Sequence, residues 1–194
     1  MKTVDFYFDL SSPYSYLAAT QIEAIAARHG ATVRWKPMVL GAVFKATGNV
    51  MPAVCEPKAR NMLVDLARWA AHYGVPFTMS SRFPLNTIKP ERLVLAAEPT
   101  GRAGVLALAL FRGMWVDDVD IADAAVMRDI ATRAGFDADA LLAATETAAV
   151  KDALRANTDE AIARGAFGAP AMFVGDQLFW GNDRLHFLED ALRA

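Results

Sequence analysis

The sequence predicts an α/β fold in which one four-stranded sheet is built from the two ends of the chain, with a large all-helical insertion between them. Two observations carry this prediction. Residues 1–40 and 160–194 contain the segments with strand-like alternation, combined with helical segments. Residues 41–159 repeat apolar side chains at intervals of three and four and show no strand pattern. We therefore expect a split sheet domain, residues 1–40 and 160–194, and a helical insertion domain, residues 41–159.

The N-terminal part has the pattern of a strand, a helix and a second strand. Residues 4–8 and 31–37 alternate and are rich in aromatic and β-branched types, as is typical of strands. Between them, residues 14–26 place apolar side chains on one helical face, with a Ser-Pro pair at 12–13 as the cap and Gly30 as the stop. Because such a crossover joins parallel strands, we expect the two strands to be parallel, with a right-handed connection.

The insertion is expected to consist of helices. Helical segments are predicted near residues 58–73, 90–98, 101–116, 120–134, 137–144 and 147–164. The segment 101–116 is apolar nearly all round, which is typical of a buried helix.

The C-terminal part returns to strands. Residues 171–174 and 177–180 are short strand-like segments on either side of a Gly-Asp turn, and residues 183–192 follow as a helix. A βαβ unit combined with a ββα unit makes a four-stranded sheet with helices on both faces, which is the thioredoxin architecture. The expected fold class is therefore a thioredoxin-like α/β fold with a helical insertion.

Composition excludes several classes of function. The chain has 194 residues, of which 54% are hydrophobic and 22% charged, so we expect a full core and little disorder. The formal net charge of −2 argues against a nucleic-acid partner or an anionic membrane surface. The lone Cys55 cannot form an intramolecular disulfide, a CxxC pair or a cysteine zinc cluster, and no histidine spacing typical of a metal site occurs. We expect no metal and assign Cys55 no role, with burial as one interpretation.

The sequence also gives no sign of export or membrane insertion. Asp5 and Asp9 interrupt the segment that would be the apolar core of a signal peptide, so we expect none. The longest strongly apolar run, residues 103–111, is far shorter than the ~20 residues that a spanning helix needs. We therefore expect a cytoplasmic protein with no membrane partner.

Ser12 is the most informative residue of the sequence. One interpretation is an ordinary helix cap. The other is chemical, because a hydroxyl group at the positive end of a helix dipole lies where an anion such as a thiolate is stabilised. Thioredoxin-fold redox proteins place their reactive cysteine at this junction of strand and helix, so a serine there can assist a bound thiol. The two interpretations are compatible.

Pro170 immediately precedes the third predicted strand. It is either a simple strand start or the second residue of a cis Ala169–Pro170 bond at a tight turn. The cis form would present the Ala169 backbone to an extended, peptide-like ligand.

Four further polar residues are candidates for a structural role, a ligand-binding role or both. One interpretation of Asn182 and Asp183 is that one of them caps the last helix, and the other is that the Asp183 carboxylate binds the ammonium group of a ligand. Lys58 stands at a helix start, where the helix dipole disfavours a cation, and this favours an anionic ligand nearby. Asn49 belongs to a Gly-Asn turn, which is usually structural.

Six segments, spread in one order over nearly the whole chain, point to a family. They are Phe8-Asp9-Leu10-Ser11-Ser12-Pro13-Tyr14-Ser15-Tyr16-Leu17, Thr47-Gly48-Asn49, Arg68-Trp69-Ala70, His72-Tyr73-Gly74, Gly165-Ala166-Phe167-Gly168-Ala169-Pro170 and Phe179-Trp180-Gly181-Asn182-Asp183-Arg184-Leu185. Together they resemble bacterial 2-hydroxychromene-2-carboxylate isomerases, relatives of the kappa-class glutathione transferases in the DsbA-like branch of the thioredoxin fold. The combination of the SPYS and GNDRL segments with the helical insertion makes the resemblance specific.

The resemblance implies a glutathione-dependent isomerase of aromatic degradation, acting as a homodimer. Its reaction would interconvert 2-hydroxychromene-2-carboxylate and trans-o-hydroxybenzylidenepyruvate through transient addition of the glutathione thiolate. The implied catalytic residue is Ser12, which activates the thiol. The implied glutathione site consists of Ser12, Asn49, Lys58, the Ala169 backbone beside a cis Pro170, Trp180, Gly181, Asn182 and Asp183.

One position departs from the family, and two other functions compete with the isomerase. Isomerases of naphthalene degradation carry a substrate-contacting lysine at the position that matches Phe44 here, with Lys45 one residue further on. A kappa-class-like transferase that joins glutathione to small electrophiles is the nearest alternative. A non-catalytic glutathione-binding protein is the other.

Overall fold

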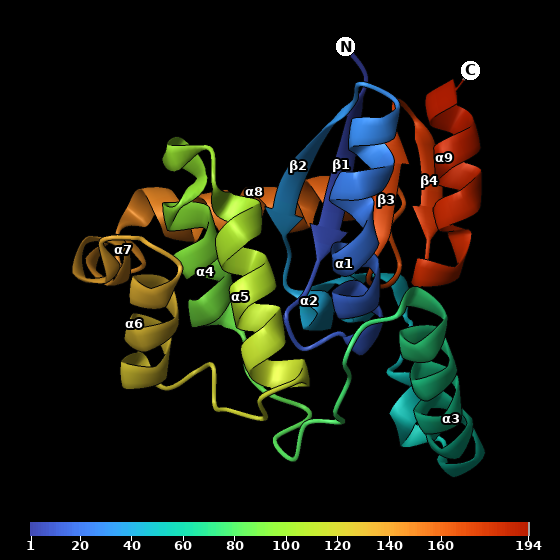
Figure 1. Cartoon of the computed structure of the whole chain (residues 1–194), viewed down its shortest axis with the longest axis horizontal. Helices are drawn as coiled ribbons and strands as arrows, with labels where there is room; N and C mark the ends of the chain where they lie inside the picture. Colours follow the sequence, from blue (N-terminus) through green and yellow to red (C-terminus); the bar gives the residue numbers. More distant parts are fainter. Residues whose placement is uncertain (194) are drawn as a thin grey trace.

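The two ends of the chain form one four-stranded sheet in the computed structural model, which describes residues 1–193 (Figure 1). The strands are β1 (Thr3–Phe8), β2 (Thr32–Pro37), β3 (Ala171–Val174) and β4 (Gln177–Trp180), in the order β2-β1-β3-β4. β1 pairs in parallel with β2 and antiparallel with β3, and β3 pairs antiparallel with β4. The predicted parallel pair, the predicted hairpin and the thioredoxin-like sheet are confirmed.

The helices follow the predicted segments, with one addition. They are α1 (Pro13–Arg28), α2 (Leu40–Thr47), α3 (Glu56–Tyr73), α4 (Ile88–Ala96), α5 (Ala103–Trp115), α6 (Ala124–Arg133), α7 (Ala138–Ala144), α8 (Ala148–Ala163) and α9 (Leu185–Arg193). The sequence does not predict α2, because this helix has only 8 residues and its cap residue, Val39, provides no side-chain hydrogen bond. α6 begins later than expected because the Asp123 carboxylate caps it.

The side chains of β1 alternate between two cores, one on each face of the sheet. Phe6 and Phe8 belong to the larger core, in which α1 and α9 cover one face and α5 packs against α1. Tyr7 points to the other face and packs with Phe173 of β3 and Ala161 of α8. The predicted buried helix, α5, fills the first core, and its Trp115 Nε1 donates to the Leu10 carbonyl at 2.9 Å. α5 thereby holds the segment that follows β1.

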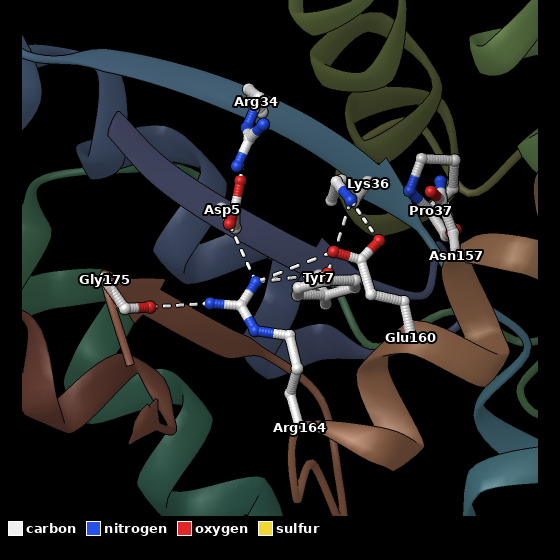
Figure 2. Close-up of polar contacts among 9 residues, drawn as sticks. All are labelled: Asp5, Tyr7, Arg34, Lys36, Pro37, Asn157, Glu160, Arg164 and Gly175. Atoms are coloured by element: carbon white, nitrogen blue, oxygen red, sulfur yellow. Dashed lines mark hydrogen bonds and ion pairs between the residues drawn. The ribbon is translucent and has the colours of Figure 1, made fainter. Parts of the chain in front are cut away.

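A charged network joins the second face of the sheet to α8 (Figure 2). The Asp5 carboxylate is buried and accepts hydrogen bonds from Arg34 on β2 and from Arg164, just beyond α8, at 2.7 Å. Lys36 pairs with Glu160 of α8 beside it. Burial alone would raise the pKa of Asp5, but hydrogen bonds and positive charge from Arg34 and Arg164 hold it below its ordinary value.

Asp5→Asn is expected to lower the free energy of unfolding by about 1–3 kcal/mol at neutral pH, since two guanidinium groups lose their buried carboxylate. Because the pKa of Asp5 is lowered by folding, its contribution is present above its ordinary pKa and is lost as the pH falls through the folded-state pKa. Urea unfolding at several pH values measures this: the gap between the two proteins should narrow in acid. Asp159→Asn, at an exposed site on α8, is the control. An equal loss of unfolding free energy in Asp5→Asn and Asp159→Asn would contradict the stabilising role of the Asp5 network.

No helix among the described residues 1–193 has the length and apolar character needed to cross a membrane.

Candidate active site

Ser12 lies at the junction where the chain leaves β1 and enters α1. Its Oγ accepts a hydrogen bond from the Ser15 amide at 3.1 Å, so Ser12 is the N-cap of a 16-residue helix. Its hydroxyl group donates to the Ala169 carbonyl at 3.3 Å. The side chain is nearly buried. The cap interpretation is confirmed, and the same oxygen lies at the positive end of the α1 dipole.

The segment before β3 faces Ser12 across the site. The Ala169–Pro170 bond is cis, as one of the two interpretations of this proline predicted. The Pro170 carbonyl accepts from the Gly181 amide at 3.0 Å, which joins this segment to the end of β4. Gly168 packs against the Trp180 indole so closely that an added Cβ would lie 2.6 Å from Nε1. Only a glycine fits here without displacing Trp180.

A third segment, between β4 and α9, completes this side of the site. Residues Asn182–Arg184 form a short 3-10 turn that no side chain caps. The Asn182 carbonyl accepts from the Tyr73 hydroxyl at 2.7 Å, whereas its buried Nδ2 has no hydrogen-bonding partner among residues 1–193. Asp183 is half-exposed and pairs with Arg184. The unpaired Asn182 amide group and the neighbouring Asp183 carboxylate are together suited to binding a polar ligand.

These three segments line one cavity of about 790 Å³. Every predicted site residue except Pro170 lines it, namely Ser12, Asn49, Lys58, Ala169, Trp180, Gly181, Asn182 and Asp183. Pro170 itself is buried behind the wall. Segments 39–44 and 83–91 and the start of α3 supply the other walls. The structure therefore brings together residues that are up to 171 positions apart in sequence.

Near α2 and α3 lie the residues whose roles the sequence does not decide. Phe44 lines the cavity and Lys45 does not. Among the lining residues, Lys58 is the only lysine or arginine. The Asn49 amide donates to the Phe167 carbonyl at 2.7 Å, so it also has the structural role that a Gly-Asn turn suggests. Cys55 is exposed and lines the cavity, so its interpretation as a buried residue is wrong.

Two tyrosines stay protonated, Tyr14 in the cavity lining and Tyr73 on α3, whose hydroxyl group contacts Asn182. The Tyr14 hydroxyl donates to Asp65 Oδ2 at 3.0 Å, and burial together with the negative charge of Asp65 raises the Tyr14 pKa. Burial likewise raises the pKa of Tyr73. Both side chains are therefore hydrogen-bond donors at neutral pH.

Sequence reasoning missed a pair of buried carboxyl groups in the cavity wall. Asp9 follows β1, Glu91 lies on α4, and both line the cavity with Thr87. Burial raises the pKa of both carboxyl groups, and the charge of Asp9 raises that of Glu91 further. Within the described residues, no group of three or more His, Cys, Asp and Glu side chains is arranged to hold a metal ion.

The fold and the site define a class of protein, a DsbA-like thioredoxin domain with a serine at the helix N-terminus. The model of the DSBA-like thioredoxin domain matches residues 3–193. A 2-hydroxychromene-2-carboxylate isomerase of Sphingobium xenophagum is 39% identical over 193 residues, which is 98% of each chain. This chain belongs to the family of 2-hydroxychromene-2-carboxylate isomerases, which are enzymes.

Two other comparisons agree with this membership. The solved structure of a 2-hydroxychromene-2-carboxylate isomerase superposes with a TM-score of 0.90 at 31% identity, covering 98% of this chain and 94% of that one. Glutathione S-transferase kappa 2 of Caenorhabditis elegans is 33% identical, over 98% of this chain and 92% of that protein. The predicted relationship to both groups is confirmed.

Proposed function

We propose that this protein is a glutathione-dependent isomerase that interconverts 2-hydroxychromene-2-carboxylate and trans-o-hydroxybenzylidenepyruvate. The observation that carries the proposal is the identity of 39% to an isomerase of that name over nearly the full length of both chains. A cavity of about 790 Å³ beside the N-terminus of α1 agrees with it, since a small tripeptide and an aromatic acid need such a volume.

The residues of the cavity fit the polar groups of glutathione. The Ser12 hydroxyl and the α1 dipole favour a thiolate. The Asp183 carboxylate is suited to an ammonium group, and Lys58 to a carboxylate. Asn182 Nδ2, buried and without a partner among residues 1–193, offers an unused donor. These residues, with Asn49, the Ala169 backbone, Trp180 and Gly181, are the proposed glutathione site.

The chain's own contribution to the mechanism is to hold and activate the thiol beside the substrate. Ser12 stabilises the negative charge on sulfur, and thereby lowers the pKa of the bound thiol. Bound glutathione supplies the nucleophile whose transient addition converts a conjugated double bond into a single bond that can rotate. The apolar wall, with Phe44, excludes water from the aromatic part of the substrate.

An absorbance assay tests the function. Purified protein is mixed with 2-hydroxychromene-2-carboxylate, with and without glutathione, and the formation of the ring-opened product is followed. We expect turnover that depends on glutathione while the total thiol concentration stays constant. Stoichiometric loss of thiol would instead favour the kappa-class-like transferase, which the kappa relatives make the second candidate. Tight binding of glutathione without turnover would favour a non-catalytic binding protein.

Glutathione is expected to stabilise the protein against heat. A ligand that binds only the folded state at a hundredfold excess over Kd adds about 2.7 kcal/mol. Asp183→Asn should weaken glutathione binding about tenfold, since a charge-assisted hydrogen bond is lost. Differential scanning fluorimetry with a glutathione titration measures both effects. Asp190→Asn, which removes an exposed carboxylate from α9, is the control. No melting shift in the wild type would contradict the proposed cofactor.

We also propose that the protein forms a homodimer in the cytoplasm. Each chain of the dimer is expected to consist of a sheet domain, residues 1–40 and 160–194, and a helical insertion domain, residues 41–159. Light scattering of the purified protein tests the dimer.

A further inference from the structure

A pair of buried carboxyl groups in the cavity wall has no part in the mechanism above. Asp9 comes from the segment after β1, Glu91 from the first turn of α4, and the Thr87 hydroxyl lies between them. Thr87 Oγ1 is 3.0 Å from Asp9 Oδ1 and 3.0 Å from Glu91 Oε1. Glu91 is fully buried and Asp9 is 6% exposed, yet both line the cavity that contains Ser12.

One hydroxyl hydrogen serves both carboxyl groups of this cluster. A hydroxyl group has a single hydrogen, so Thr87 donates it to one of the two carboxyl groups or shares it between them. One such hydrogen does not compensate two buried negative charges. The cluster therefore favours a proton on Asp9 or on Glu91.

The surrounding donors assign this proton to Glu91. Asp9 accepts from two backbone amides, those of Ser11 at 2.8 Å and Leu40 at 2.9 Å, and such donors stabilise a negative charge. Glu91 accepts from one amide, that of Leu10, at 3.4 Å. Asp9 is thus the carboxylate, and Glu91 is the neutral carboxyl group.

Burial and charge agree with this assignment. Burial raises the pKa of Glu91 and the neighbouring charge of Asp9 raises it further, while the bonds from Thr87 and Leu10 oppose the shift only in part. The charged group that faces Glu91 is Asp9, and no basic side chain of residues 1–193 forms an ion pair with either carboxyl group. Two negative charges in this place would repel each other without compensation, so the pair retains one proton.

The neutral carboxyl group also has unused hydrogen-bonding capacity. Glu91 Oε2 is buried and has no partner among the described residues. A buried polar atom without a partner is rare in native proteins and calls for an explanation. Since Glu91 lines the cavity and its Oε1 already meets Leu10 and Thr87, Oε2 is the oxygen that can carry the proton toward a ligand bound there.

We propose that Glu91 and Asp9 form the acid–base pair that opens the ring of the substrate. This inference rests on the proposed isomerase function. The ring form of 2-hydroxychromene-2-carboxylate is a cyclic hemiketal, in which carbon 2 carries both the ring oxygen and a hydroxyl group. In the step, the bond between carbon 2 and the ring oxygen breaks, and the hydroxyl oxygen becomes the ketone oxygen.

The proton balance of this step matches the single proton of the pair. The ring oxygen takes the Glu91 proton and becomes the phenol hydroxyl. The hemiketal hydroxyl group releases its proton to the carboxylate pair, either directly to Glu91 or through Thr87 and Asp9. The pair holds one proton before and after the step, and no oxidant, reductant or metal is consumed.

A pair of substrates separates ring opening from the rotation that depends on the thiol. The first is 2-hydroxychromene-2-carboxylate. The second is cis-o-methoxybenzylidenepyruvate, whose methyl ether cannot close to a hemiketal, so that its isomerisation needs no proton on the aryl oxygen. The variant is Glu91→Gln, whose amide can keep the hydrogen bonds to Thr87 and Leu10 but has no acidic proton. Glu146→Gln, at an exposed position outside the cavity, is the matched control.

We expect Glu91→Gln to lower kcat on the ring substrate by about 10²- to 10⁴-fold, the usual contribution of a general acid. Its kcat on the methyl ether should stay within about threefold of wild type. Equal losses on both substrates, or no loss on either, would overturn the proposal and leave the isomerase function intact. A wild type that is inactive on both substrates with glutathione would instead overturn the proposed function, and with it this inference.

Asp9→Asn gives an independent test if the first variant does not fold. Removing the charge of Asp9 lowers the pKa of Glu91, so the alkaline fall of kcat on the ring substrate should move to lower pH. Infrared spectroscopy supplies a readout without turnover: the free wild-type protein should show the carbonyl band of a protonated carboxyl group at neutral pH, and Glu91→Gln should lack it. A wild type without this band would overturn the proposal.

Discussion

Turnover by the Ser12→Ala variant is expected to fall by about 10²- to 10³-fold, the usual effect of removing a donor that stabilises developing negative charge. Two contacts of Ser12 define what is lost. Its Oγ caps α1 through the Ser15 amide, and its hydroxyl group can turn from the Ala169 carbonyl to a thiolate in the cavity. The cap alone is worth about 0.5–2 kcal/mol of stability and cannot account for lost turnover per folded molecule.

The two roles of Ser12 separate when stability and thiol ionisation are both measured. Thr147→Ala removes an N-cap of the same kind from α8, outside the cavity, and should cost stability without affecting turnover. The pH dependence of thiolate absorbance in the glutathione complex should shift to higher pH for Ser12→Ala and remain unchanged for Thr147→Ala. Full activity with an unchanged titration would reduce Ser12 to a helix cap.

Gly168→Ala is expected to weaken glutathione binding at least about tenfold, through overpacking that costs about 1–3 kcal/mol. The new Cβ would lie 2.6 Å from Trp180 Nε1, so either the indole or the Gly168–Ala169 backbone must move. Both belong to the cavity wall, and the Ala169 carbonyl is the partner of Ser12.

Gly41→Ala is the matched control for this change. Gly41 also lines the cavity, but it lies within α2, and a Cβ there meets no atom within 4 Å. Calorimetric titration with glutathione compares the two variants. Equal affinities for Gly168→Ala and the wild type would contradict the assignment of this wall to the glutathione site.

The sequence is informative wherever the signal is local. The strand–Ser-Pro–helix junction at Ser12 follows from neighbouring residues, because a cap, a helix-starting proline and the first apolar turn are adjacent. The segments around Ala169 and Asp183 are found through the resemblance to the isomerase family, and both line the cavity. The division of the chain into a sheet domain, residues 1–40 and 160–194, and a helical insertion domain, residues 41–159, stays a prediction.

What the sequence does not predict depends on contacts between distant residues. Asp9 and Glu91 are 82 positions apart, and neither has a neighbour in sequence that indicates a pair. Only the packing of α4 against the segment after β1 brings them to Thr87. Burial is one interpretation of Cys55 from the sequence, because isolated cysteines are often buried. In the structure Cys55 is exposed and lines the cavity, because the chain between α2 and α3 passes along it.

The strand order has a consequence for synthesis on the ribosome. β1 is the second strand of the sheet, and its neighbour β3 is formed by residues 171–174, near the other end of the chain. A nascent chain that has emerged only as far as α8 therefore exposes one edge of β1 and leaves the Tyr7 ring without its contact to Phe173 of β3. The far wall of the cavity, from Gly168 to Asp183, is absent at that stage as well. The growing chain thus acquires its four-stranded sheet and its ligand cavity together, once residues 168–183 have emerged. Until then it offers an unpaired strand edge to chaperones or to other nascent chains.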